Sequence, residues 1–346
     1  MNLLDPPEIS INRLIKRKIT PTVTVVVCTR DRVEMLQRCL GAVRKLRHPG
    51  FAVVVVDNAP SSDSARAAAA LHGAQYVVEP VRGVSRARNA GARHCATDIL
   101  AYLDDDMVPH PDWLSALVAE FGDPEVVAVS GPVLPMENEG GDAQRLREEV
   151  RSRPWGPEPF HLHRLSPKWF ERANFGGVGD GNMAFRRDAF DRWSGFEVRI
   201  GRGAPVNGGE EHYAFFELIE RGGTVAYTPR ALVFHADKAP TDALSLRNIA
   251  ESSAYATFLC VRHPRYAARI LRFYVEALAG KRRAWRSGNS QPVLANVSRS
   301  MALGAFIRGV WTCLGSLLAS RASPGVAKTS PPARRVTAER EQARGA

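Results

Sequence analysis

The chain has 346 residues, of which 45% are hydrophobic and 24% charged, and its formal net charge is +11. This composition is ordinary for a soluble globular protein and supplies enough apolar residues for one large core or two smaller ones. The five cysteines are odd in number and lack CxxC spacing, which argues against a disulfide framework or a zinc site and favours a reducing compartment.

Residues 1–20 read as a short leader with a basic cluster, and their start, MNLLDPPEIS, lacks the basic and apolar segments of a signal peptide. The run Val23–Val27 follows, short, β-branched and apolar at every position. A half-exposed strand would alternate, so this run predicts a strand buried on both faces of a parallel sheet.

Strand-like and helix-like segments alternate over the next hundred residues. Strands are expected within 51–58, 75–80 and 98–106, and helices within 33–46, 61–73, 84–96 and 110–121. Ser85 is in position to cap the third helix. This alternation predicts right-handed crossovers and an open, mostly parallel sheet. Ligands of such sheets bind beyond the carboxyl ends of the strands, where Thr29–Asp31, Asp57–Asn58 and Asp104–Asp106 would meet.

The second half of the chain is less regular. We expect a strand within 126–135, a loop-rich insert at 137–172, a strand and helix within 179–196, a helix within 207–223 and a strand pair within 224–237. A long irregular insert is often functional. Together these segments define a predicted α/β domain at 21–241.

Residues 242–320 are expected to form a helical extension, and residues 321–346, rich in Ser, Pro, Ala and Arg, a disordered tail. Within 301–319 the apolar run is interrupted by Arg308, which favours an interfacial or core helix over a full membrane span. Residues 261–346 hold 16 Lys and Arg against 3 Asp and Glu. This charge fits a solvated tail or an anionic membrane surface, and no recognisable nucleic-acid module accompanies it.

Three consecutive aspartates, Asp104 to Asp106, end an apolar strand. Like charges this close repel and raise at least one pKa, whereas a divalent cation with hard oxygen ligands relieves the repulsion. Mg²⁺ or Mn²⁺ at this point would also suit a diphosphate. The alternative is an acidic loop or helix cap.

Two more groups lie at the same predicted edge. Asp57 ends the second strand, where its carboxylate can accept from a base N–H or a ribose hydroxyl, or act only as a turn residue. The segment RGVSRARNAG carries Arg82, Arg88 and Asn89. Its arginines could offset diphosphate charge, or form a solvated basic helix face.

The segments VVVCTRDR, VVVVDNAPSSD, RGVSRARNAG, AYLDDDMVPHPDWL, GDGNMAFRRDAF and GGEEHYAFFELIERGG occur in this order between residues 22 and 236. In this set the chain resembles the family-2 glycosyltransferases, which have the GT-A fold. That resemblance implies a nucleotide-sugar donor and a single displacement that inverts the anomeric centre.

The resemblance also implies roles for individual residues on the donor side. Those matching the family's nucleotide and diphosphate positions are Thr29, Arg30, Asp57, Arg88, Asn89 and Asp104, with Asp105 sharing the role of Asp104. Asp106 matches the metal-binding acid, and His235 matches a histidine that completes the metal site. Asn182 and Met183 match a turn that lines the donor sugar and the acceptor. Trp113 and Trp169 could stack on sugars or pack in the core.

An inverting transferase needs a base aligned with the acceptor hydroxyl. In the family this base is the aspartate of a Gly-Glu-Asp motif, which here reads Gly209–Glu210–Glu211. The resemblance therefore assigns the base to Glu211, one methylene longer, with Glu210 as the second candidate. Both could instead be first-turn acids favoured by the helix dipole. The family's next acid, two positions on, is replaced by Tyr213.

We therefore expect a glycosyltransferase that uses Mn²⁺ or Mg²⁺ and a UDP-sugar or similar donor, with a glycan or lipid-linked acceptor and no nucleic-acid partner. The expected location is cytoplasmic or peripheral at the inner face of the plasma membrane. Two alternatives are a catalytically inactive, membrane-docked scaffold and a nucleotidyltransferase. The second would carry a glycine-rich phosphate loop after the first strand, where CTRDR has no glycine.

Overall fold

The computed structural model describes residues 21–153, 155–176, 179, 181–236, 241–278 and 297–322. The predicted leader 1–20 and residues 323–346 of the predicted tail lie outside these ranges. The first part of the chain contains β1 (Val23–Thr29), α1 (Val33–Val43), β2 (Ala52–Asn58), α2 (Ser64–Leu71), β3 (Gln75–Glu79), α3 (Val84–His94), β4 (Ile99–Asp104), β5 (Met107–Pro109) and α4 (Trp113–Glu120). These elements agree with the predicted alternation, apart from the short strand β5.

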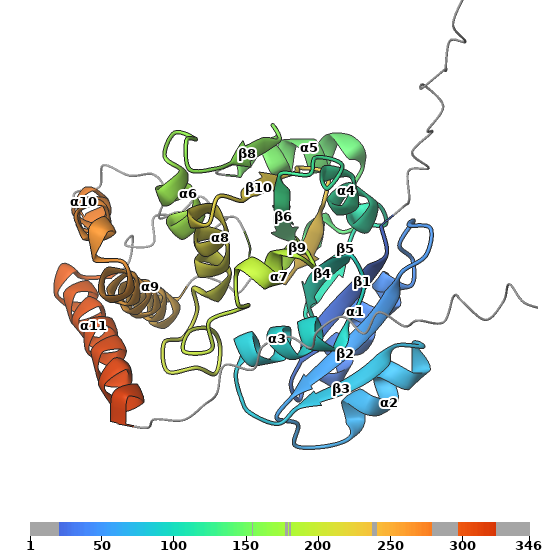
Figure 1. Ribbon diagram of the computed structural model, residues 1–346, viewed down its shortest axis with the longest axis horizontal. Helices are drawn as coiled ribbons and strands as arrows, with labels where there is room; N and C mark the ends of the chain where they lie inside the picture. The colour runs from blue at the N-terminus through green and yellow to red at the C-terminus, as the bar shows by residue number, and fades with distance from the viewer. Residues whose placement is uncertain are drawn as a thin grey trace, which may run out of the picture.

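The second part adds shorter strands and the C-terminal helices. Its elements are β6 (Val126–Ser130), β7 (Val133–Pro135), η2 (Met136–Asn138), α5 (Ala143–Ser152), β8 (Phe160–Leu162), α6 (Trp169–Phe175), β9 (Asn182–Arg186), α7 (Ala189–Arg192), α8 (Glu210–Glu220), β10 (Thr224–Tyr227), β11 (Val233–His235), α9 (Asp242–Arg262), η3 (Pro264–Tyr266), α10 (Ala267–Leu278) and α11 (Arg299–Ala322). In Figure 1 the chain runs from β1–β3 on the right to α9–α11 on the left.

An eight-stranded sheet forms the centre, in the order β3-β2-β1-β4-β9-β6-β10-β8. Strands β3, β2, β1 and β4 are parallel, as predicted, and β6 pairs with β10 in parallel. β9 lies antiparallel between β4 and β6, and β8 is antiparallel at the edge. The sheet is therefore mostly parallel, as expected for an α/β fold.

Side-chain alternation along β1 explains the layers on either side of the sheet. Val23, Val25 and Val27 join a core with residues of α1, α2 and α4. Val26 and Cys28 point the other way, into a core shared with α3, α6, α8, α9 and α10. Because successive side chains of a strand point to opposite faces, a strand covered on both faces is apolar throughout.

A second, three-stranded sheet has the order β5-β11-β7. It corrects two expectations. Residues 126–135 form two strands in different sheets, and the predicted strand pair of 224–237 is likewise divided between them. The insert 137–172 is also more ordered than expected, since it contains α5, β8 and the start of α6. Leu146 and Val150 of α5 pack on Leu232 and Phe234 of this sheet, and that packing outweighs the polar character of the segment.

Ser85 does not cap α3, because its hydroxyl donates to the carbonyl of Ile200 at 2.7 Å. The residue before the helix is Gly83, with φ 140°, and its N–H donates to Asn58 Oδ1 at 2.8 Å. The bond from Gly83 ties the start of α3 to the end of β2, and the bond from Ser85 ties it to the loop that contains Ile200.

Candidate active site

Three strand ends carry the predicted site residues to one edge of the sheet. The register of β1 with its neighbours pairs Thr29 with Asp57 on β2 and Cys28 with Asp104 on β4. His235 arrives on the small sheet, where it pairs with Met107, directly after Asp106. Residues distant in the sequence therefore meet at the position where α/β sheets bind ligands.

Asp105 is fully buried and held by the residues after β1. Thr29 Oγ1 donates to its Oδ2 at 2.6 Å, and Arg32 donates to both of its oxygens, at 3.2 Å from Nε to Oδ2 and by a shorter bond from Nη2 to Oδ1. Burial raises the pKa of Asp105 to about 7, against the opposing effects of Arg32 and Thr29. Thr29 and Asp105 therefore hydrogen-bond to each other, and neither side chain faces solvent.

Asp106 lies between a guanidinium and an imidazole. Its Oδ2 accepts from Arg32 Nη1 at 2.7 Å and lies 3.6 Å from His235 Nε2. Burial raises the pKa of Asp106, but His235 and Arg32 outweigh burial and lower it to about 2. The carboxylate is therefore ionised, and Arg32 is the cation that balances it.

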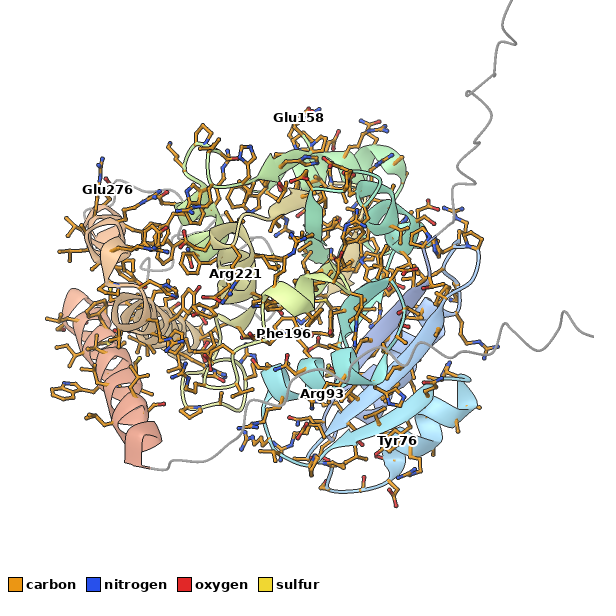
Figure 2. The ribbon with its side chains drawn as sticks, in the orientation of Figure 1. Tyr76, Arg93, Glu158, Phe196, Arg221 and Glu276 are labelled. Carbon is orange, nitrogen blue, oxygen red and sulfur yellow. The ribbon has the colours of Figure 1, made fainter. Side chains whose placement is uncertain are left out.

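Arg88 corrects the interpretation of α3 as a solvated basic face. Its guanidinium is 1% exposed, lies over the ring of Phe196 (labelled in Figure 2), and donates to three carboxylates. Nη1 is 3.0 Å from Glu210 Oε1, and Nη2 is 3.0 Å from Asp104 Oδ1 and 2.5 Å from Glu211 Oε1. In this arrangement Arg88 offsets protein charge, not diphosphate charge.

The chain before β9 closes this cluster. The N–H of Gly181 donates to both oxygens of Glu211, at 3.0 and 2.9 Å. Gly181 has φ 79°, and a Cβ here would lie 2.6 Å from Asp104 Oδ2. Only glycine can therefore lie between the acid at the end of β4 and the acids that open α8.

Asp57 is 1% exposed at the end of β2. Its Oδ2 accepts from the hydroxyl of Tyr76 at 2.8 Å, whereas its Oδ1 has no hydrogen-bond partner among the described residues. Burial raises the pKa of this carboxyl group. A buried acceptor without a partner is costly unless a ligand supplies the donor.

Arg30 and Arg82 are both exposed. Arg30 Nε donates to the carbonyl of Ala59 at 3.4 Å, which places it over the end of β2. Arg82 lies beside Gly203 and has no ion-pair partner within the described residues. Either guanidinium could reach an anionic ligand at this edge.

The structure does not support direct ligand contact by three other predicted residues. Asn89 uses its amide to bind the backbone of Phe196, at 2.7 and 2.8 Å. Asn182 is fully buried: it accepts from Trp113 Nε1 at 2.7 Å and donates to the carbonyls of Pro132 and Ala231. Met183 is also fully buried, within β9.

Trp113 and Trp169 likewise pack in the core, 0% and 6% exposed. Aromatic and amide side chains next to a site are as useful for packing as for binding, and the motif pattern did not distinguish the two.

Sequence reasoning missed Arg32, Tyr76 and Gly181. Arg32 is the second basic residue of the segment CTRDR, which directly follows the first strand. Its position opposite the three aspartates at the neighbouring strand end was the signal that could have identified it. Gly181 lies in the segment GDGNMAFRRDAF. Tyr76 lies on β3, and nothing in the sequence linked it to Asp57.

The donor set around Asp106 fits a divalent cation in part. No group of three or more His, Cys, Asp or Glu side chains in the described part of the chain is arranged to hold a metal ion. Asp106 and His235 form a pair, however, and Mg²⁺ commonly uses one or two protein ligands, with the oxygens of substrate phosphates completing the shell. The pair could serve as the protein half of such a site.

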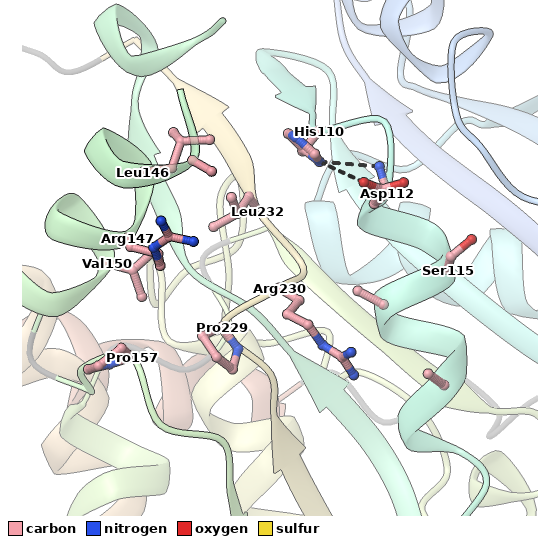
Figure 3. A pocket seen from close by; sticks show the side chains of 13 residues that line it. His110, Asp112, Ser115, Leu146, Arg147, Val150, Pro157, Pro229, Arg230 and Leu232 are labelled. Atoms are coloured by element: carbon pink, nitrogen blue, oxygen red, sulfur yellow. Dashed lines mark hydrogen bonds and ion pairs between the residues drawn. The ribbon is translucent and has the colours of Figure 1, made fainter. Parts of the chain in front are cut away.

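A separate cavity of about 660 Å³ lies between α4, α5 and the turn before β11 (Figure 3). Its walls are largely apolar, and the polar side chains that line it are His110, Asp112, Ser115, Arg147 and Arg230. None of the predicted site residues lines it.

Residues 24–193 match the family model of glycosyl transferase family 2. This chain carries a family-2 glycosyltransferase domain. The predicted family, and the glycosyltransferase class of this domain, are thereby confirmed.

Among curated proteins, the chain is 29% identical over 255 residues to the pre-mycofactocin glycosyltransferase of Mycobacterium tuberculosis. That match covers 70% of this chain but only 48% of the relative, so the chain spans about half of that relative's length. It is also 28% identical over 277 residues to the succinoglycan biosynthesis protein ExoM of Rhizobium meliloti, covering 76% of this chain and 78% of that one.

Solved structures share the fold at low sequence identity. A mannosyltransferase from Pyrobaculum calidifontis, in complex with GDP-mannose and Mn²⁺, has a TM-score of 0.51 at 20% identity, covering 89% of this chain and 77% of that one. Residues 1–349 of S. aureus TarS have a TM-score of 0.53 at 13% identity, covering 84% and 81%. The predicted GT-A fold is thereby confirmed.

Proposed function

We propose that this glycosyltransferase moves a sugar from a nucleoside-diphosphate donor, with UDP-sugars as the first class to test, to a hydroxyl group of a glycan or lipid-linked acceptor, inverting the anomeric centre. The observation that carries the proposal is the meeting of Asp57, Asp106 and His235 at one sheet edge, with Glu211 close to Asp104 through Arg88. The family supplies the reaction class, and this geometry supplies the positions.

The nucleotide would bind over the ends of β1 and β2. Asp57 Oδ1 has no hydrogen-bond partner in the part of the chain that the structure describes, so it can accept an N–H of the base or a ribose hydroxyl without losing a bond seen there. Arg30 and Arg82, both exposed at this edge, would contact the ribose or the diphosphate. Asp104 would lie nearer the ribose.

Asp106 and His235 would hold Mn²⁺ or Mg²⁺. Bound there with the diphosphate, the cation would neutralise charge on the leaving group. Arg32 Nη1 must then release or share Asp106 Oδ2, since it now lies 2.7 Å from it. The GDP-mannose and Mn²⁺ in the Pyrobaculum mannosyltransferase support this choice of ligands.

Glu211 would act as the base, with Glu210 as the second candidate. The carboxylate takes the proton of the acceptor hydroxyl as that oxygen forms its bond to the anomeric carbon, while the bond from that carbon to the diphosphate oxygen breaks. Arg88 and the N–H of Gly181 fix the direction in which Glu211 points. A base held this way suits a single displacement, which requires exact alignment.

The acceptor and the cellular location are also proposals. The succinoglycan biosynthesis protein among the relatives supports a glycan acceptor, and the name of another relative, a glucosyl-dolichyl phosphate glucuronosyltransferase of Haloferax volcanii, supports a lipid-linked one. We place the enzyme in the cytoplasm, attached peripherally to the inner face of the plasma membrane.

Turnover of a panel of UDP-, TDP- and GDP-sugars in the presence of Mn²⁺ tests the reaction, and a thermal shift reports donor binding separately. Asp106→Ala should abolish turnover, whereas Asp63→Ala, at a largely exposed acid directly before α2, should not. Glu211→Gln should keep donor binding and lose turnover. Activity that survives EDTA and Asp106→Ala would refute the metal role, and donor binding without any turnover in the native chain would favour the inactive scaffold.

A further inference from the structure

The last helix, α11, has two different faces. The inner face carries small residues, Ala302, Ala305 and Gly309, and packs along α9. At Gly309 the helices approach so closely that a Cβ would clash with the side chain of Ser253 and the carbonyl of Ala250. Ser253 Oγ donates to the carbonyl of Phe306 at 3.0 Å. α11 is therefore bound tightly to the body of the protein.

The outer face of α11 is apolar and exposed. Leu303, Ile307, Trp311 and Leu318 recur at spacings of four, four and seven residues, which places them on one side of a helix. Trp311 and Leu318 are each 68% exposed. Large apolar side chains aligned on an exposed helix are unusual in a monomeric soluble domain and mark an interaction surface.

The sequence that contains α11 is basic. Arg308 is exposed on α11, and residues 261–346 carry a net charge of +13, whereas the first 260 residues sum to −2. An apolar stripe with a tryptophan, next to exposed Arg308 and within a basic part of the sequence, matches the chemistry of a bilayer surface with anionic lipids. A protein partner would have to reproduce the same combination.

By length and composition, Ser300–Ala319 could cross a membrane, and 22% of this stretch is buried in the protein. The seam with α9 argues against a crossing. A spanning α11 would have to leave α9, or take with it polar groups of α9 such as the Arg247–Glu251 ion pair. A helix lying flat keeps the seam and buries only its outer face.

We propose that α11 docks flat on an anionic membrane, with Leu303, Ile307 and Leu318 in the interface and Trp311 at headgroup level. α10, which contacts α11 through Tyr274 and Phe306, lies beside this surface. This face of α11 would be the surface through which the protein attaches to the membrane, as proposed above. The docking does not depend on the transfer reaction.

Sedimentation of the full chain with vesicles tests this docking. The protein should bind vesicles that mix phosphatidylcholine with phosphatidylglycerol as the anionic lipid, bind pure phosphatidylcholine weakly, and be released by salt. Leu303→Gln combined with Trp311→Gln should weaken binding roughly tenfold or more, and Arg308→Gln about fivefold. Leu165→Gln, at a residue 88% exposed beyond β8, is the matched control and should bind like the native chain.

Each other outcome overturns the proposal. Equal binding to both vesicle types, or unchanged binding by the double variant, would exclude docking through this face. Protein that resists extraction by high salt and alkaline carbonate would indicate a spanning helix. A native dimer in lipid-free solution that Leu303→Gln with Trp311→Gln dissociates would assign the face to a second copy of the chain. Donor-induced thermal shifts, unchanged in all variants, show that the donor site is intact.

Discussion

Asp104 and Glu211 accept hydrogen bonds from the same nitrogen, Nη2 of Arg88, at 3.0 and 2.5 Å. One residue ends a strand of the parallel half of the sheet, and the other opens a helix far along the chain. Their common donor is 1% exposed. The donor side and the base candidate are therefore mechanically coupled, and a disturbance at one should be felt at the other.

Arg88→Gln should destabilise the protein by about 3–5 kcal/mol, because it leaves buried carboxylates without their cation. Arg88→Lys should recover part of this loss, since one ammonium cannot match the geometry of the guanidinium. Chemical denaturation measures both variants. Arg93→Gln, which removes an exposed arginine of the same helix from a 3.4 Å pair with Glu79, should cost little. Equal stability of Arg88→Gln and Arg93→Gln would show that the ion pairs of Arg88 contribute nothing to the free energy of unfolding.

The sequence alone allowed the first half of the sheet to be predicted, because β1, β2 and β4 are continuous apolar runs that end in polar residues. It also placed Thr29, Asp57 and Asp104 at one edge, since parallel strands share their carboxyl ends. It could not show which polar side chains bind protein and which face a ligand. Asn182 and Arg88 stand in the right motifs, yet their partners come from segments distant in the sequence.

The small sheet and α5 were not predicted for a related reason. β5, β7 and β11 have three residues each, too few for a periodic pattern. α5 is mostly polar, and its two buried side chains gain their burial only from the small sheet. Elements that depend on tertiary contacts carry a weak local signal.

Asp57→Asn should weaken binding of UDP or another nucleoside diphosphate by roughly tenfold or more, since it replaces a charged acceptor with an amide. The matched control is Tyr76→Phe, which removes the hydroxyl group that donates to Asp57 Oδ2 and leaves the carboxylate of Asp57 in place. Isothermal titration calorimetry measures both. Unchanged affinity of Asp57→Asn would remove this residue from the donor site.

Arg32→Gln should tighten the binding of Mn²⁺ alone by roughly tenfold, because a cation within ion-pair distance of Asp106 competes with the metal. It should also lower stability by about 1–3 kcal/mol, as buried Asp105 loses its charged partner. Mn²⁺ titration followed by electron paramagnetic resonance, without donor, gives the affinity. Weaker Mn²⁺ binding by the variant would mean that Arg32 organises the site instead of competing for it.

Stability should depend on pH through three partly buried histidines, His48, His110 and His263. Burial lowers the pKa of each below 6.5. Below pH 6.5 the unfolded chain then binds more protons than the folded one, so this contribution to stability is present above pH 6.5 and is lost as the pH falls through the folded pKa values. Asp105, with its pKa raised to about 7, acts in the opposite direction.

The readout is therefore a comparison between two proteins. Thermal unfolding of the native chain and of the variant with His48, His110 and His263 all replaced by Gln, at pH 5.5, 6.5 and 7.5, isolates the histidine contribution. The native chain should lose more stability on acidification than the variant. Parallel pH profiles would show that the three histidines titrate alike in the folded and unfolded states.

Gly309→Ala should loosen the seam between α9 and α11, because the new methyl group would clash with Ser253 and Ala250. Overpacking of this kind costs about 1–3 kcal/mol. Gly304→Ala and Gly315→Ala offer matched controls on the same helix, since a Cβ at either position meets nothing within 4 Å. Those two changes should stabilise α11 by about 0.5–1 kcal/mol, the cost of glycine inside a helix.

Hydrogen exchange along α11, together with thermal unfolding, distinguishes these effects. Faster exchange in Gly309→Ala, with slower exchange in the two controls, would show that close packing at Gly309 keeps the helix on α9. The same variant should then bind anionic vesicles less selectively, because a detached α11 exposes its small-residue face as well as its apolar stripe. If Gly309→Ala matches the controls in both measurements, α11 is held by other contacts, and the argument that the seam prevents a membrane crossing loses its basis.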